Sequence, residues 1–130
     1  MPKILLNCEI EFTMHLIGGK YKALILDLLL EDGPRWFNQL LGEIHHISQK
    51  TLTNQLRELE SDGLIARRVF PQKPPRVEYS ITEKGRSLEP ILQLMCSWGY
   101  QHLDDRFALI NPQCGETAQA ALSAPEGQNT

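Results

Sequence analysis

The hexapeptide PQKPPR, residues 71–76, limits most strongly what this 130-residue chain can fold into. Three of its six residues are proline, which lacks the backbone amide that a helix interior or a central strand must donate. The runs on either side, residues 64–70 and 77–81, are rich in β-branched and aromatic residues. Alternate residues of the second run, from Val77 to Ile81, share one face. We therefore predict a β-hairpin with a long, stiff tip.

The sequence before the hairpin predicts helices. Apolar residues recur there at helical spacing, and Asp32-Gly33-Pro34 provides a turn between two of the periodic segments. Ser48 is a good N-cap for the last of these helices, and Gly63 ends it. The predicted helices cover residues 9–16, 20–31, 35–45 and 49–61.

After the hairpin, Thr82 caps a predicted helix over residues 83–107, in which Pro90 should cause a kink or a break. Beyond Asn111-Pro112 the sequence contains almost no large apolar side chain, and we predict a disordered tail over residues 109–130. The expected fold is mainly α with a small β-hairpin wing. Its element order is that of a winged helix-turn-helix, and we expect one domain over residues 1–108.

The predicted helix at 49–61 separates two kinds of side chain around its axis. Leu52, Leu56 and Leu59 lie on one side, and polar side chains lie opposite. Lys and Arg pair with guanine acceptors, Asn pairs with adenine, and Thr can touch a thymine methyl group. The free backbone amides at the start of a helix can bind a phosphate group. We predict DNA contacts by Ser48 and Arg57 and base readout by Gln49, Lys50, Thr53 and Asn54.

The acidic total charge hides a basic segment. Residues 64–86 contain six basic and two acidic residues, a net charge of +4, which leaves −7 for the rest of a chain whose total is −3. A locally basic segment in an acidic chain is more typical of a DNA-binding protein than of a membrane-binding one. A stiff loop with arginine near its tip can enter a minor groove. We therefore add Lys73 and Arg76 to the predicted DNA-binding residues.

Two other functions fit the same residues. A winged-helix module that binds protein and not DNA is the alternative, supported by the acidic total and by Glu58, Glu60 and Asp62. Small-molecule sensing is a third hypothesis, with a pocket lined by Phe12, Trp36 or Trp98, although the sequence identifies no such effector. No nucleophile–base arrangement is visible, so we do not expect an enzyme.

Four segments closely resemble the HxlR-type regulators, which are relatives of the MarR group: LIGGKYKALIL from Leu16, DGPRWFNQL from Asp32, ISQKTLTNQLRELESDGLIAR from Ile47 and PPRVEYSITEKGRSLEPIL from Pro74. The resemblance covers residues 8–102 without a gap. It implies a homodimer that binds a palindromic operator in double-stranded DNA and regulates neighbouring transcription. The family's recognition helix matches residues 49–60 and its wing residues 71–78. Family members carry two basic residues where this chain has Arg35-Trp36, so Arg35 is a predicted contact and a second one is missing.

Dimerisation also follows from spacing in the last predicted helix. Its apolar stripe exceeds what a small winged domain needs for its own core, and an identical subunit related by a twofold axis is the simplest partner. The stripe can also fold back on its own domain, and we expect both uses. The predicted interface comprises Phe12 of the first helix with Leu88, Ile91, Leu92, Met95, Trp98 and His102.

The cysteines, Cys8, Cys96 and Cys114, are odd in number and have no metal-binding spacing. We predict no metal or cofactor, no secretory signal, no membrane partner and a cytoplasmic protein. Cys8 precedes the first helix, whose dipole favours a thiolate, and it matches the cysteine that some HxlR-type regulators use to sense electrophiles or oxidants. The neighbouring Glu9 and Glu11 oppose thiolate formation, so a buried, inert thiol is the interpretation we favour over a redox sensor.

Overall fold

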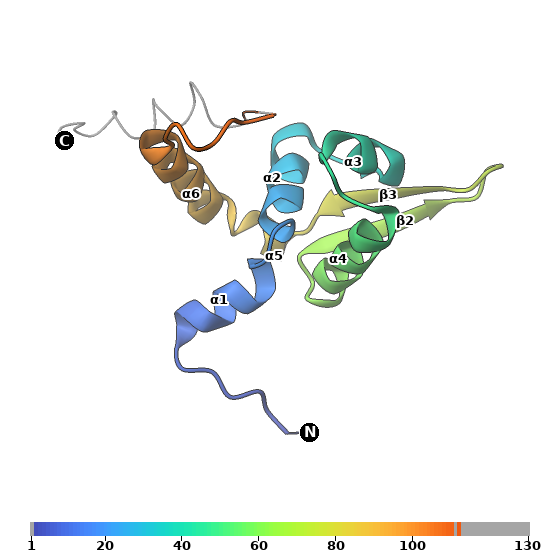
Figure 1. The fold of residues 1–130 in the computed structure, drawn as a ribbon. Helices are drawn as coiled ribbons and strands as arrows, with labels where there is room; N and C mark the ends of the chain where they lie inside the picture. Colours follow the sequence, from blue (N-terminus) through green and yellow to red (C-terminus); the bar gives the residue numbers. More distant parts are fainter. Residues whose placement is uncertain (1, 111, 113–130) are drawn as a thin grey trace. The chain divides into compact units, whose positions relative to one another are not determined.

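A computed structural model describes residues 2–110 and 112 of the chain (Figure 1). The rest of the predicted tail lies outside the described residues. The chain divides into two compact units that meet between Ser87 and Leu88, and each is treated by itself below. This division falls inside the region that the sequence suggested was one domain.

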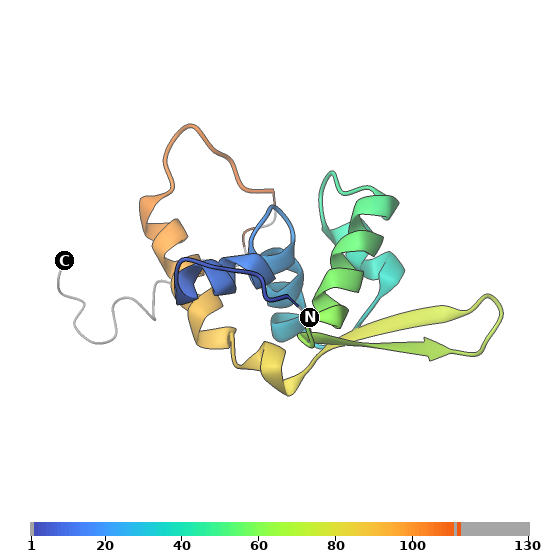
Figure 2. The same ribbon diagram turned by 90° about the horizontal axis from the view of Figure 1, so that it is seen from below.

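The first unit has the expected order of helices followed by a hairpin, and the winged helix-turn-helix fold is confirmed. Its elements are α1 (Glu9–Ile17), α2 (Lys22–Asp32), β1 (Arg35–Trp36), α3 (Phe37–Glu43), α4 (Gln49–Ser61), β2 (Ile65–Phe70), β3 (Arg76–Ile81) and α5 (Glu83–Arg86). The second unit contains α6 (Glu89–His102). Figure 2 shows the hairpin extending beyond the helices of the first unit, which leaves its tip free.

The sheet has the strand order β1-β3-β2, and all its pairs are antiparallel. Arg67 of β2 lies opposite Tyr79 of β3, and Arg68 lies opposite Glu78. Since side chains alternate along a strand, Arg67 and Tyr79 share the face of Ile65, and Arg68 lies on the other face. Ile65 and Tyr79 are buried, and β2 and β3 contact α4, α3 and α2. Arg67 therefore lies on the face that the helices cover.

Two local predictions differ in outcome. Arg35 and Trp36 were expected in a helix, but they form β1 by pairing with Tyr79 and Glu78. The local apolar spacing could not reveal this pairing, because the partner strand lies far along the chain. The predicted break near Pro90 is confirmed, since α5 ends at Arg86 and α6 begins at Glu89. Pro90 occupies the first turn of α6, where its missing amide costs nothing.

The core of the first unit forms around α4. Leu52, Leu56 and Leu59 are at most 1% exposed, as the predicted apolar face requires. An ion pair between Lys22 of α2 and Glu58 of α4 joins two helices at the edge of this core. Lys22 is buried. Glu58, one of the acids that had supported a protein-binding surface, is thus held in an ion pair within the domain.

Candidate nucleic-acid interface

The outward face of α4 is fixed by its caps and its core. The Ser48 hydroxyl oxygen accepts a hydrogen bond from the Thr51 amide at 3.0 Å, which confirms the predicted N-cap. Because the leucine face is seated in the core, Lys50 and Asn54 point to solvent on the opposite side. The Thr53 hydroxyl donates to the Gln49 carbonyl oxygen at 2.8 Å, so its methyl group is the part left for a base.

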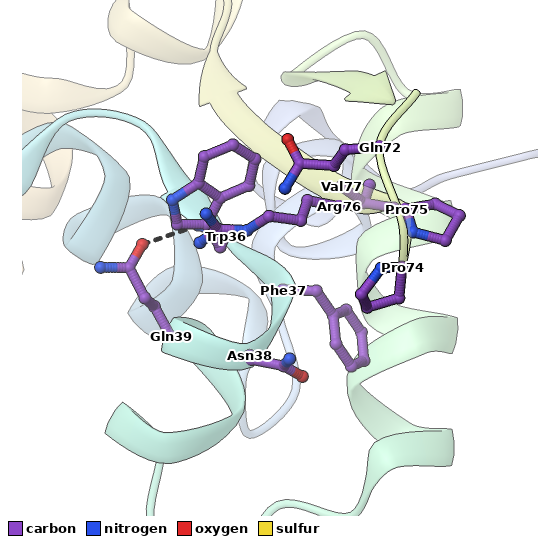
Figure 3. Close-up of a pocket in the computed structure, with 9 residues that line it drawn as sticks. All are labelled: Trp36, Phe37, Asn38, Gln39, Gln72, Pro74, Pro75, Arg76 and Val77. Atoms are coloured by element: carbon purple, nitrogen blue, oxygen red, sulfur yellow. Dashed lines mark hydrogen bonds between the residues drawn. The ribbon is translucent and has the colours of Figure 1, made fainter. Parts of the chain in front are cut away.

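Three adjoining hollows form one groove from the start of α4 to the wing. The first, of about 540 Å³, is lined by Gln49, Lys50, Thr53, Asn54 and Arg57. The second, of about 440 Å³, is lined by Phe37, Thr53, Arg57, Glu60, Arg67 and Tyr79. The third, of about 360 Å³, is lined by Trp36, Phe37, Asn38, Gln39, Gln72, Pro74, Pro75, Arg76 and Val77 (Figure 3). The first and second hollows share Thr53 and Arg57, and the second and third share Phe37. Arg76 itself belongs to the sheet face of Arg68, opposite to that of Arg67.

The groove is basic along its whole length. Lys50 and Arg57 line its first part, Arg67 its middle and Arg76 its far end, against a single lining carboxylate, that of Glu60. The five predicted α4 contacts thus come together in one hollow. Arg67 belongs to the basic segment recognised in the sequence, but its place in the site could not be predicted from that segment alone.

The wing carries a row of alternating cations and aromatic rings. The Arg76 guanidinium lies 3.7 Å from the centre of the Trp36 ring, and the Trp36 and Phe70 rings meet edge to face at 5.2 Å. Arg68 continues the row, 4.6 Å from the centre of the Phe70 ring. Cation–π and edge-to-face contacts both stabilise such an arrangement. Trp36, which the sequence suggested only as a lining residue of a small-molecule pocket, thus holds Arg76 in place beside the third hollow (Figure 3).

Arg35 and Lys73 lie outside the groove. The Arg35 guanidinium pairs with Asp32 at 2.6 Å and with Glu43 at 3.3 Å, and its side chain is only 17% exposed. These partners give Arg35 a packing role between α2 and α3. Lys73 is exposed in the loop between β2 and β3. It extends the basic surface at the tip of the wing.

Residues 16–107 match the model of the HxlR-like helix-turn-helix family. The chain belongs to this family. A helix-turn-helix transcriptional regulator of Halalkalibacterium halodurans is 50% identical over 91 residues, which cover 70% of this chain and 80% of the relative. The regulator YtcD of Bacillus subtilis is 47% identical over 114 residues, 85% of this chain and 90% of the relative. The oxidised form of the redox regulator HypR superposes with a TM-score of 0.70 at 47% identity, covering 75% of this chain and all of HypR.

Membership of the HxlR-like family makes this chain a DNA-binding transcription regulator and not an enzyme. The groove on α4 and the wing is the surface of this HxlR-like protein that suits nucleic acid. None of the helices within the described residues is long and apolar enough to span a membrane.

The two units of the HxlR-like chain each expose apolar side chains. On α1, Ile10, Phe12 and Met14 are 74%, 49% and 53% exposed. On α6 and just beyond it, the exposed apolar residues are Ile91, Leu94, Met95, Trp98, Tyr100 and Leu103. Among the other predicted interface residues of α6, Leu92 is buried and Leu88 is half-buried. His102 is exposed and stacks on Trp98, with ring centres 4.2 Å apart.

Cys8 is the N-cap of α1, and its thiol is free and exposed. The expectation of a buried thiol is therefore wrong, because α1 has only one buried residue, Ile17 at its far end. One turn away, Glu11 Oε1 accepts hydrogen bonds from the Asn7 backbone amide and from Asn7 Nδ2, both at 2.8 Å. These bonds hold the pKa of Glu11 below its usual value, so this carboxylate is charged at neutral pH near Cys8.

Proposed function

We propose that this protein binds a palindromic DNA operator as a homodimer, with α4 in a major groove and the wing in the adjacent minor groove. The row of basic hollows from α4 to the wing carries this proposal. A recognition helix reads base edges through its N-terminal residues, and arginine is favoured in a narrow minor groove. Here the N-terminal residues of α4 can supply the base contacts, and Arg76 of the wing can supply the minor-groove arginine.

The predicted contacts divide by chemistry. Lys50 and Asn54 offer hydrogen bonds to guanine and adenine edges, Gln49 can pair with adenine, and the Thr53 methyl group suits thymine. The amides beside Ser48 and the Arg57 guanidinium suit backbone phosphates. At the wing, Arg76 and Lys73 suit the minor groove and its phosphates.

The exposed apolar residues of α1 and α6 support the homodimer. Several large apolar side chains exposed on one helix often mark an interface, and most homo-oligomers use a twofold axis. Phe12, Met95 and Trp98 are the strongest candidates, because each combines a large apolar side chain with an exposed fraction near one half or more. A twofold dimer would present two α4 helices about 34 Å apart, one turn of DNA. This spacing matches a palindromic operator.

Fluorescence anisotropy tests the proposal directly. The protein is titrated against DNA from immediately upstream of its own gene and against a scrambled duplex of equal length, over a salt series. We expect a preference of about a thousandfold for the upstream duplex and a steep loss of affinity as salt rises. Two chains should bind each duplex. The absence of binding to either duplex at low salt would overturn the proposal and favour the protein-interaction module.

We also propose that Cys8 is a redox- or electrophile-responsive thiol, supported by its exposure at the start of α1 and by the similarity to the redox regulator HypR. Native protein treated with iodoacetamide at neutral pH should be alkylated at Cys8, as peptide mass mapping would show. Operator affinity should change after treatment, and the Cys8→Ser variant should bind equally well with and without it. An unmodified Cys8 would remove this proposal and leave the DNA proposal intact.

A further inference from the structure

The middle of the groove contains two arginines from different elements. Arg57 projects from α4 and Arg67 from β2, and both line the second hollow. Tyr79, opposite Arg67 in the sheet and 7% exposed, is the buried residue that lines the same hollow. Both arginines are exposed. Within the described part of the chain, no carboxylate lies within ion-pair distance of either guanidinium group.

The position of the second hollow along the groove indicates which part of the DNA lies over it. It shares Thr53 and Arg57 with the hollow at the start of α4, and it shares Phe37 with the hollow at the wing. In the proposed complex, α4 lies in a major groove and the wing in the neighbouring minor groove. The two grooves of a duplex are separated by one sugar–phosphate backbone. That backbone must therefore cross the protein between α4 and the wing.

We propose that Arg57 and Arg67 together bind a single backbone phosphate at this crossing. The inference rests on the proposed function and adds Arg67 to the DNA-binding residues. A phosphodiester presents two charged oxygens, and guanidinium groups match them with paired N–H donors. Two guanidinium groups from α4 and β2 fix the phosphate relative to both elements. The contact thereby sets the spacing between major-groove and minor-groove contacts and carries no base preference of its own.

Glu60 lies in the same hollow and opposes this contact. Its carboxylate reduces the positive potential at the phosphate site, since like charges repel. Replacing it, as Glu60→Gln, should tighten binding to all duplexes to a similar extent. The same variant made together with Arg67→Ala should give a smaller gain, because less phosphate contact remains to be strengthened.

Arg68 offers a matched control for Arg67. It is the next residue in the same strand and carries the same charge, but it lies on the sheet face away from α4, over the Phe70 ring at 4.6 Å. Removing either arginine changes the net charge of the protein equally. Any larger effect at Arg67 must therefore come from its position in the groove.

The experiment compares the full-length wild type, Arg67→Ala and Arg68→Ala by anisotropy on the upstream and scrambled duplexes at several salt concentrations. Arg67→Ala should weaken binding about tenfold on both duplexes and leave their ratio unchanged. It should also reduce the salt slope by roughly 0.9 for each protomer bound. Arg68→Ala should leave affinity within about twofold. Equal effects of the two variants would overturn the proposed phosphate site.

Neutral methylphosphonates, placed at one phosphate at a time in the upstream duplex, give a second measurement. The wild type should lose affinity when the phosphate between the two grooves is neutralised, whereas Arg67→Ala should lose clearly less at that position, because only Arg57 still contacts it. If the loss of affinity caused by Arg67→Ala and the loss caused by the methylphosphonate simply add, Arg67 does not contact that phosphate directly. If the wild type itself shows no preference for the upstream duplex, the proposed function fails. Wild-type preference with no coupling to the phosphate would remove this inference alone.

Discussion

Replacing Lys50 and Asn54 together with alanine is expected to remove the preference for the operator and leave only weak, salt-dependent binding to any duplex. Both side chains line the first hollow of the groove and point away from the leucine face of α4. Each good pair between a side chain and a base contributes about 1–3 kcal/mol of discrimination, and a dimer makes each pair twice. The ratio between upstream and scrambled duplexes should fall from about a thousandfold to near one.

The double variant should fold normally, because both residues are exposed and alanine favours the helix. Circular dichroism checks this point. Lys20→Ala is a matched control for lost charge, since Lys20 is exposed between α1 and α2 and does not line the groove. A double variant that still prefers the upstream duplex by a thousandfold would show that α4 does not read the bases.

The faces of α4 could be predicted because they depend only on neighbouring residues. The helical period separates its leucines from its polar side chains, and Ser48 supplies a local cap, so the bounds at Gln49 and Ser61 were predicted correctly. No other helix or strand is needed to form the first hollow, since all its lining residues come from α4. A site made by one element can be found by periodicity alone.

The middle and far end of the groove could not be predicted in the same way, because they depend on pairing between distant segments. Arg67 joins the groove through its register with Tyr79, and Trp36 meets Arg76 because β1 pairs with β3. Alternation along β2 places Arg67 and Arg68 on opposite faces, but only the packed helices show which of the two lies beside α4.

The structure also explains how a chain of net charge −3 can present a basic groove. Several acids are neutralised in ion pairs: Glu58 pairs with the buried Lys22, and Asp32 and Glu43 pair with Arg35. In contrast, the cations that line the groove are Lys50, Arg57, Arg67 and Arg76. At the ionic strength of a cell, charges more than about 8–10 Å away are largely screened, so the local excess matters more than the total.

Gly85 lies where the turn after α4, the end of β3 and the start of α5 meet. Thr82 caps α5 by accepting from the Gly85 amide at 3.0 Å, and its own hydroxyl donates to the Gly63 carbonyl oxygen at 2.7 Å. The Thr82 amide donates to the Leu64 carbonyl oxygen at 3.1 Å. A Cβ atom at Gly85 would lie 2.2 Å from that same Leu64 oxygen and 2.8 Å from Ile81 Cδ1.

Gly85→Ala should therefore destabilise the fold strongly. The Leu64 oxygen belongs to the backbone and is held by Thr82, so relief requires moving α5 away from the sheet. Overpacking of this kind typically costs about 1–3 kcal/mol, and losing the Thr82–Leu64 hydrogen bond adds about 1 kcal/mol. We expect a loss of about 3 kcal/mol in the free energy of unfolding, measured by urea titration, and a melting temperature lower by about 10 °C.

Gly42→Ala is the matched control for this change. Gly42 lies in α3, is exposed, and a Cβ atom there would meet nothing within 4 Å. Alanine should stabilise α3 by about 0.5–1 kcal/mol through its helix propensity. Both variants must be compared with the wild type at one protein concentration, because dimerisation would couple stability to concentration. A Gly85→Ala protein as stable as Gly42→Ala would show that α5 does not depend on this close contact.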